Sequence, residues 1–145
     1  MTARLRDERG SAAIEAAIGL PAFVLFVGLI IAGGRLAIAH QALQSAAADA
    51  ARTASIARDA GEADSAAKRE AETSLRNQKL DCRIAQVSVD TSGFRLPTGQ
   101  PADVTVTVSC RVDLADLSVP GVPGSRLIRA TMSSPIDTWR ERGLP

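Results

Sequence analysis

Residues 9–34 read RGSAAIEAAIGLPAFVLFVGLIIAGG, which is the most apolar stretch of the 145-residue chain. Glu15 is its one charged residue after Arg9, and residues 16–34 carry no charge. A run of about 20 apolar residues is long enough to cross a hydrocarbon core of about 30 Å as a helix. The sequence therefore predicts a membrane-spanning helix over residues 11–34.

Basic residues precede this stretch at Arg4, Arg6 and Arg9. Because a short basic flank is retained in the cytoplasm, we expect the N-terminus inside and residues 35–145 outside the membrane. A secretory signal peptide has the same order of charged and apolar residues, but its apolar region spans only about 7 to 15 residues. Removal of the whole segment by a cut near residues 35–39 is the alternative.

The boundary between the basic and apolar parts contains Gly10, Ser11 and Glu15. A carboxylate in the middle of a membrane helix costs about 2.5–3.5 kcal/mol, and less near the interface, so Glu15 calls for a partner. Cleavage after Gly10 would place a positive amine on Ser11, one helical turn before Glu15. The alternative is an uncleaved chain in which Glu15 simply reaches back to the lipid headgroups.

The segment Arg-Gly-Ser-Ala-Ala-Ile-Glu followed by Ala-Ala-Ile-Gly-Leu-Pro, residues 9–21, resembles the start of the TadE-like proteins. These are pilin-like components of the Tad (tight adherence, or Flp) pilus system of the type IV pilus group. The resemblance implies cleavage by a prepilin peptidase after Gly10 and a role as a minor pseudopilin in pilus assembly. Gly10, Ser11 and Glu15 match by position, whereas Ala16 departs from the aromatic residue that often follows the glutamate. The ending of the chain over residues 134–140 also resembles this family.

Two helices are expected beyond the membrane. The first is predicted by small apolar residues that recur every three, four or seven positions: Leu36, Ala39, Leu43, Ala46, Ala50, Ala54 and Ala57. We expect this stem helix over residues 35–58. Asp59 and Glu62 resemble a capping box that starts a second helix over residues 60–78. Its apolar stripe consists of Ala63, Ala67, Ala71 and Leu75.

The C-terminal part is predicted to be a small sheet. Residues 103–112 alternate strictly between polar and apolar, with valine or cysteine at each even position, as in a strand with one buried face. Candidate strands flank it at 83–89 and 126–133, so we expect a sheet over residues 83–134. Three antiparallel strands need a cover, which the two helices offer. The predicted class is α+β and pilin-like: a long N-terminal transmembrane helix that continues into a stem, a second helix and a three-stranded antiparallel sheet.

Cys82 and Cys110 are the two cysteines of the chain. An exported domain meets an oxidising compartment, where a bond between them would stabilise the fold by about 3 to 4 kcal/mol in the chain-entropy model. A metal pair or a redox dithiol is disfavoured, since the Cys-x-x-Cys spacing and a histidine partner are both missing from the sequence. We therefore predict a structural disulfide.

Composition and motifs argue against several function classes. The net charge is +1 and aromatic residues make up 3% of the chain, which disfavours a nucleic-acid partner. His40 is the one histidine and has no metal-ligand cluster or nucleophile around it, so we expect neither an enzyme nor a cofactor nor a small-molecule substrate. Trp139 either caps the sheet edge or marks a contact surface, and both readings stay open.

These expectations combine into a single-pass protein of the bacterial cytoplasmic (inner) membrane. Residues 1–10 form the prepilin leader, residues 11–34 the transmembrane helix and residues 35–145 the extracytoplasmic domain. Its expected partners are membrane lipid, a prepilin peptidase, other pilin-like subunits and the Tad assembly platform. The alternative is a membrane-anchored accessory or adhesion module that does not enter a filament.

Overall fold

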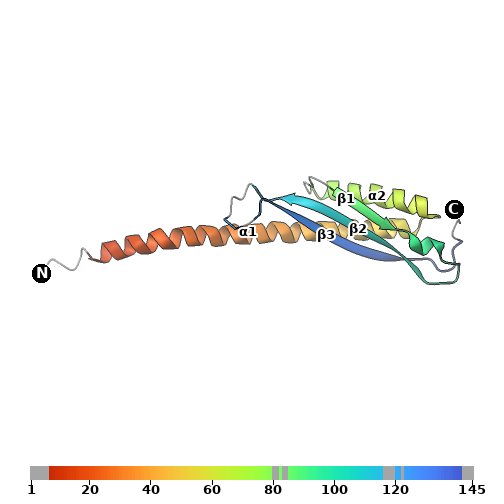
Figure 1. Cartoon of the computed structure of the whole chain (residues 1–145), viewed down its shortest axis with the longest axis horizontal. Helices are drawn as coiled ribbons and strands as arrows, with labels where there is room; N and C mark the ends of the chain where they lie inside the picture. The colour runs from red at the N-terminus through yellow and green to blue at the C-terminus, as the bar shows by residue number, and fades with distance from the viewer. Residues whose placement is uncertain (1–6, 80–81, 83–84, 116–119, 122, 142–145) are drawn as a thin grey trace.

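The computed structural model describes residues 7–79, 82, 85–115, 120–121 and 123–141, with the backbone alone for residues 7–11. Within these residues the elements are α1 (Asp7–Ser55), α2 (Ala60–Asn77), β1 (Ala85–Asp90), the 3-10 helix η1 (Ser92–Arg95), β2 (Ala102–Asp113) and β3 (Ser125–Ile136). The predicted α+β class is confirmed, with a long N-terminal helix, a second helix and then an antiparallel sheet (Figure 1). Of the expected leader, residues 1–6 lie outside the described part.

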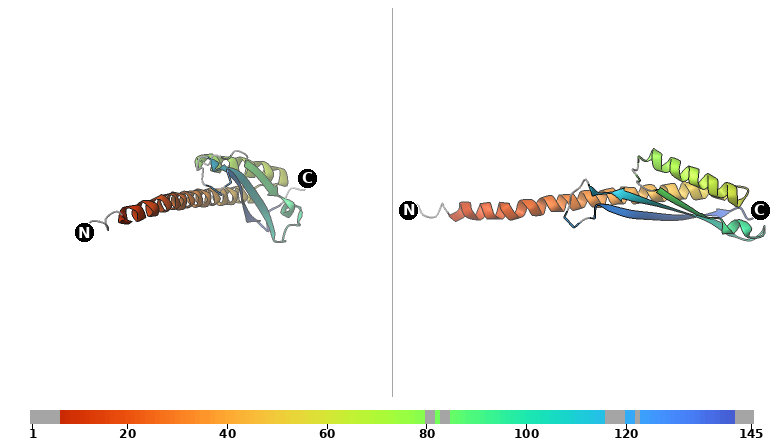
Figure 2. Two further views of the ribbon diagram at one scale, coloured as in Figure 1. Left: turned by 60° about the vertical axis from the view of Figure 1, so that its left-hand side comes forward. Right: turned by 45° about the horizontal axis from the view of Figure 1, so that its top comes forward.

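Helix α1 is 49 residues long, or about 73 Å at 1.5 Å per residue. Figures 1 and 2 show that its N-terminal half extends away from the rest of the molecule, while its C-terminal half lies against α2 and the sheet. Pro21 lies within α1, and the helix continues through it without interruption. The bend that a proline is expected to cause is therefore too small to divide the helix.

The C-terminal half of α1 buries the predicted stripe. Leu43, Ala46, Ala50 and Ala54 are each fully buried, and Ala39 is 1% exposed. Because alanine side chains are short, α2 and the sheet can approach the backbone of α1 closely along this face. Each contact buries little area, so stability comes from many close contacts along the length of the helix.

The turn between the two helices begins earlier than the sequence pattern indicates, because α1 ends at Ser55 and not near residue 58. The physical reason is the start of α2. Asp59 has extended backbone angles and accepts a hydrogen bond from Glu62 N at 2.8 Å, while Arg58 N donates to Glu62 Oε2 at 2.9 Å. This reciprocal cap needs a non-helical approach to α2, so α1 stops before it.

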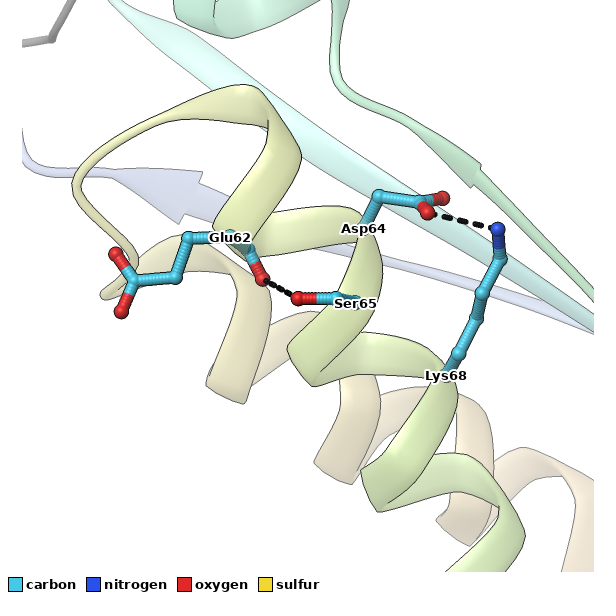
Figure 3. Close-up of polar contacts among 4 residues, drawn as sticks. All are labelled: Glu62, Asp64, Ser65 and Lys68. Atoms are coloured by element: carbon cyan, nitrogen blue, oxygen red, sulfur yellow. Dashed lines mark hydrogen bonds and ion pairs between the residues drawn. The ribbon is translucent and has the colours of Figure 1, made fainter.

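Helix α2 has a buried face and a solvated face. The predicted stripe is buried, with exposed fractions of 4% or less at Ala63, Ala67, Ala71 and Leu75. On the other face, Lys68 Nζ lies 2.7 Å from Asp64 Oδ2, and Ser65 Oγ donates to the Glu62 carbonyl (Figure 3). Exposed pairs of this kind contribute only a few tenths of a kcal/mol, so packing against α1 positions α2.

The sheet has the strand order β1-β2-β3, with both neighbouring pairs antiparallel. Val108 pairs with Val87 and Ala130, which places an apolar row on the face that covers the helices. The opposite face is polar, and there the Thr107 and Thr131 hydroxyls are 2.9 Å apart. The sheet is therefore amphipathic, as the alternation in residues 103–112 predicts.

The flanking strands differ slightly from the expected ranges. β1 begins at Ala85, and the expected residues 83 and 84 lie outside the described part. β3 continues through Pro135 to Ile136, beyond the expected end at residue 133. β3 lies at an edge of the sheet, where the missing N–H of a proline costs no ladder hydrogen bond.

The link from β1 to β2 contributes to the core through Phe94, which is 3% exposed. Gly93 precedes it, and any side-chain carbon on Gly93 would overlap the Asp103 carbonyl oxygen. Glycine is therefore required at this position for η1 to lie against β2. At the start of this link, Asp90 accepts a hydrogen bond from Ser92 N at 2.9 Å, which lowers the pKa of the Asp90 carboxyl.

Cys82 and Cys110 form a disulfide with a Cα–Cα distance of 5.4 Å. The bond joins the segment that follows α2 to the central strand of the sheet, with a sequence separation of 28 residues. It therefore ties the segment after α2 covalently to the sheet.

We expect the paired substitution Cys82→Ser and Cys110→Ser to lower the free energy of unfolding by about 3.5 kcal/mol, because the unfolded chain regains the entropy of a 28-residue loop. Chemical denaturation of the full chain in detergent, followed by circular dichroism, measures this loss. The matched control is the wild-type protein in reductant, which should show the same loss. A double variant as stable as the oxidised wild type would contradict the role of the bond.

Candidate assembly site on the N-terminal helix

The N-terminal half of α1 is bare of contacts with the rest of the described chain. From Ala12 to Ile31 every residue is exposed except Gly28, which is half-buried. Apart from Glu15 the exposed residues are apolar, and many are large, including Ile18 at 69% and Phe23 at 66%. We call residues 12–31 the bare segment. Soluble monomers rarely expose a contiguous apolar surface of this extent, so the bare segment needs an apolar environment.

The length of the bare segment matches a lipid bilayer. About 20 helical residues span about 30 Å, which is the thickness of the hydrocarbon core. Helix α1 is long and apolar enough to cross a membrane, and it lies near the N-terminus. The structure is therefore compatible with the membrane anchor that the sequence predicts.

The bare segment ends where the folded domain begins to cover α1. Ala32 is 4% exposed and Ala39 is 1% exposed, and both lie on the face that continues to Leu43. Helix α1 is unbroken across this boundary. Its apolar residues surround the helix before the boundary, and they form a stripe on one face after it. The expected end of the transmembrane helix at residue 34 stays a prediction, and burial of the helix by the domain begins close to it, at Ala32.

The predicted processing residues all lie in α1. The helix begins at Asp7, so the backbones of Gly10, Ser11 and Glu15 are helical, and Ser11 lies one turn before Glu15. Glu15 is exposed, and among the side chains that the structure describes, none forms an ion pair with it. The side chains of residues 7–11 lie outside the described part. The backbone of α1 thus places Ser11 and Glu15 one helical turn apart, and their roles in processing stay a prediction.

A shallow groove runs along the same side of α1 as Glu15. Its lining consists of Ala12, Glu15, Ala16, Gly19, Leu20 and Phe23. Gly19 has open space around it, since a side-chain carbon built there would meet no atom within 4 Å. Small residues on a membrane helix allow the backbone of another helix to approach closely. A helix seated in this groove would face the Glu15 carboxylate.

This arrangement favours an electrostatic contact in a medium of low dielectric constant. A carboxylate at the end of an apolar groove gains most from a cation that is brought to it within the same environment. An amine on Ser11 would be such a cation, either in the same chain or in a neighbouring one. Cleavage at Gly10 requires the helix to unwind there, and glycine lowers that cost because it is a weak helix former close to the helix start.

The C-terminal segment contacts the other end of α1. Arg140 Nη1 donates to the Ile56 carbonyl at 2.6 Å, which satisfies a backbone group just past the helix end and places a cation at the negative end of its dipole. Ser134 Oγ lies 3.1 Å from Ser55 Oγ. Sequence reasoning missed these contacts, because they join residues about 80 positions apart and follow no local pattern.

Trp139 and His40 are both on the surface. Trp139 is 82% exposed, and its backbone N–H donates to Asp137 Oδ1 at 3.0 Å in a tight turn. It therefore does not cap the sheet, and the reading as a contact surface is the one that this exposure supports. His40 is exposed on α1, where its Nε2 lies 3.2 Å from Gln44 Nε2.

Residues 10–52 match the family of TadE-like proteins. No curated protein and no solved structure gives a significant match to the chain. The matched residues contain the Gly10–Glu15 junction, the bare segment and most of the covered part of α1, so the resemblance predicted from the sequence is confirmed over this range. The resemblance of residues 134–140 lies outside the match and stays a prediction.

We expect Gly19→Leu to weaken association of α1 with neighbouring membrane helices by at least about threefold, because the new side chain fills the groove. Cross-linking of the full chain in membranes measures this association. The matched control is Ala17→Leu, which adds a similar side chain to the opposite side of the bare segment. Both variants should insert normally, and an equal effect of the two would contradict the role of the groove.

Proposed function

We propose that the chain is a minor pilin-like subunit of a Tad pilus, anchored in the cytoplasmic membrane and processed by a prepilin peptidase. The match of residues 10–52 indicates involvement in Tad pilus assembly, and the matched family is associated with pili and not with catalysis. The observation that carries the more specific proposal is the position of Glu15. It is an exposed carboxylate on an otherwise apolar helix, one turn after the Gly10–Ser11 bond.

In this proposal the bare segment crosses the membrane once. The basic residues before it stay in the cytoplasm, and the domain that begins near Ala32 lies outside. The length of the bare segment supports this placement, because a helix of about 20 residues is as long as the hydrocarbon core is thick. The disulfide between Cys82 and Cys110 also supports an oxidising compartment for the domain.

Cleavage after Gly10 would remove residues 1–10 and with them Arg4, Arg6 and Arg9. These arginines hold the N-terminus at the cytoplasmic surface, so their loss lowers the cost of moving the helix out of the bilayer. The new amine on Ser11 then neutralises Glu15, either within the chain or across to a neighbour. Processing thus converts a fixed anchor into a helix that can leave the lipid.

Assembly would transfer the bare segment from lipid to the helices of other pilin-like subunits. The groove around Gly19 lets a helix of a neighbouring subunit approach α1 closely. Pairing of Glu15 with an amine fixes the axial position of the two helices relative to each other. The proposed partners are the prepilin peptidase, other pilin-like subunits and the Tad assembly platform. No step of this proposal needs a cofactor or a small-molecule substrate.

The second candidate is an accessory or adhesion module that stays in the membrane. The exposed Trp139 favours it, because an aromatic side chain that is 82% exposed is suited to contact another molecule. Deletion of the gene separates the two candidates. Loss of surface filaments, together with co-purification with the assembly platform, supports the subunit, whereas intact filaments support the accessory module.

We expect the mature protein to begin at Ser11, because a glycine before the cut offers least resistance to the extended backbone that a protease needs. Mass spectrometry of the N-terminal peptide from membrane-extracted protein measures this. Gly10→Leu should leave the chain uncut, while the control Ala13→Leu, three residues beyond, should be processed. An intact Met1 or Thr2 on the wild-type protein would refute processing.

We expect Glu15→Leu to insert into the membrane normally and to lose co-assembly with other pilin-like subunits, because the amine on Ser11 would have no carboxylate to pair with. Membrane fractionation measures insertion, and co-purification with the filament fraction measures assembly. Glu72→Leu removes an exposed carboxylate from α2 and serves as the control that should assemble normally. Normal assembly of the Glu15 variant would exclude the pairing mechanism.

A further inference from the structure

The C-terminal end of β2 and the N-terminal end of β3 lie beside α1, near the point where the bare segment stops. Figures 1 and 2 show these two strand ends on the side of the domain nearer the N-terminus. The antiparallel pairing reaches Asp113 and Ser125, and Leu114 N then donates to the Gly124 carbonyl at 2.8 Å. Leu114 is 2% exposed, so its side chain is buried where the two strands end.

No spacer separates this hairpin from the bare segment. Ala32 follows the bare segment directly and is already 4% exposed. A bilayer is about 40–45 Å thick with its headgroups and about 30 Å without them, so each headgroup layer is about 5–8 Å deep. At 1.5 Å per residue, this layer corresponds to about the next four or five residues of α1. With the bare segment in the hydrocarbon core, as the proposed function has it, the strand ends beside this part of α1 would lie at the depth of the headgroups.

The side chains at these strand ends combine apolar and basic chemistry. Pro120, Pro123 and Leu127 are exposed, with Leu127 at 54%. Arg111 and Arg126 are also exposed, and Arg111 Nη1 lies 3.4 Å from Ser125 Oγ across the strands. We call these five residues the hairpin base: Arg111, Pro120, Pro123, Arg126 and Leu127.

The carboxylates of the described domain are gathered mostly at its other end. They include Asp59, Glu62, Asp64, Asp90, Asp103 and Asp137. Near the hairpin base, Asp113 accepts a hydrogen bond from Ala115 N at 3.0 Å and is half-buried. The hairpin base therefore carries two exposed arginines beside one half-buried carboxylate, whereas the far end carries these carboxylates together with the exposed Arg58, Arg95 and Arg140.

We propose that the hairpin base docks on the anionic headgroups of the outer face of the membrane that α1 crosses. This inference rests on the anchoring in the proposed function and extends it to the domain. A lipid surface is the occupant that fits, because the base is continuous with the bare segment, carries positive charge and ends in apolar side chains. Docking holds the domain in a set orientation over the membrane until α1 is withdrawn.

The arginines provide the preference for anionic lipid. An arginine near an anionic membrane surface strengthens binding about fivefold. We therefore expect Arg111→Gln with Arg126→Gln to lower the docked-to-undocked ratio about 25-fold at low salt. Arg58→Gln with Arg95→Gln removes the same charge from exposed positions at the far end of the domain and is the matched control.

Tryptophan fluorescence of the full chain tests the docking. Trp139 is the native tryptophan and follows the far end of β3, a 12-residue strand about 40 Å long. The other probes are Phe23→Trp and Leu127→Trp, each in a Trp139→Phe background. Each protein is reconstituted in phosphatidylglycerol–phosphatidylcholine vesicles that contain a phospholipid spin-labelled at the headgroup or in the acyl chain.

We expect the headgroup label to quench Leu127→Trp strongly, the acyl-chain label to quench Phe23→Trp, and neither label to quench Trp139. The arginine pair variant should reduce the quenching of Leu127→Trp, and the control pair should not. Pro123→Trp provides a second probe of the hairpin base if Leu127→Trp folds poorly by circular dichroism.

Two results would overturn the docking while leaving the anchor intact. In the first, Leu127→Trp and Pro123→Trp are quenched no more than Trp139 while Phe23→Trp is quenched by the acyl-chain label. In the second, quenching is equal in pure phosphatidylcholine vesicles, which would remove the anionic headgroup as the ligand. Absence of quenching at Phe23→Trp would instead refute the membrane anchor on which the proposed function depends.

Discussion

The structure depends on one constraint, which is that a single helix must be stable in two different environments. Over the bare segment, residues 12–31, α1 presents apolar side chains on all sides apart from Glu15, as suits a helix in lipid. From Ala32 onward it presents a narrow stripe of alanine and leucine to its own domain. Because the helix is continuous from Asp7 to Ser55, the same backbone carries both surfaces without a hinge between them.

Continuity of α1 joins the proposed anchoring to the proposed assembly. The sheet and α2 pack on α1 through short side chains, and the contact between Arg140 and the Ile56 carbonyl joins the end of the chain to the end of the helix. A force or displacement applied to the bare segment therefore reaches the domain through a packed interface. A subunit of a filament needs this property, since its helix and its domain must move together.

The charged groups near the membrane have roles that follow from their positions. Glu15 is unfavourable in lipid alone, so it gives the bare segment a preference for a partner that carries a positive charge. In the proposed docking, the arginines of the hairpin base lie at the opposite boundary of the membrane and favour anionic headgroups. In the proposed cycle, removal of the leader and formation of the Glu15 pair favour departure from the membrane, and the hairpin base opposes it.

Local and periodic features were determined by the sequence alone. The apolar run predicted the bare segment, the alanine spacing predicted the buried stripes of both helices, Asp59 predicted the start of α2, and strict alternation predicted the central strand. The junction at Gly10 and Glu15 was equally visible, because four-residue spacing in a helix is a local property. The tertiary structure alone decided that β3 continues through Pro135, that Trp139 is exposed and that Arg140 meets the Ile56 carbonyl. These features depend on contacts between residues far apart in the chain, and no local pattern encodes which distant groups will meet.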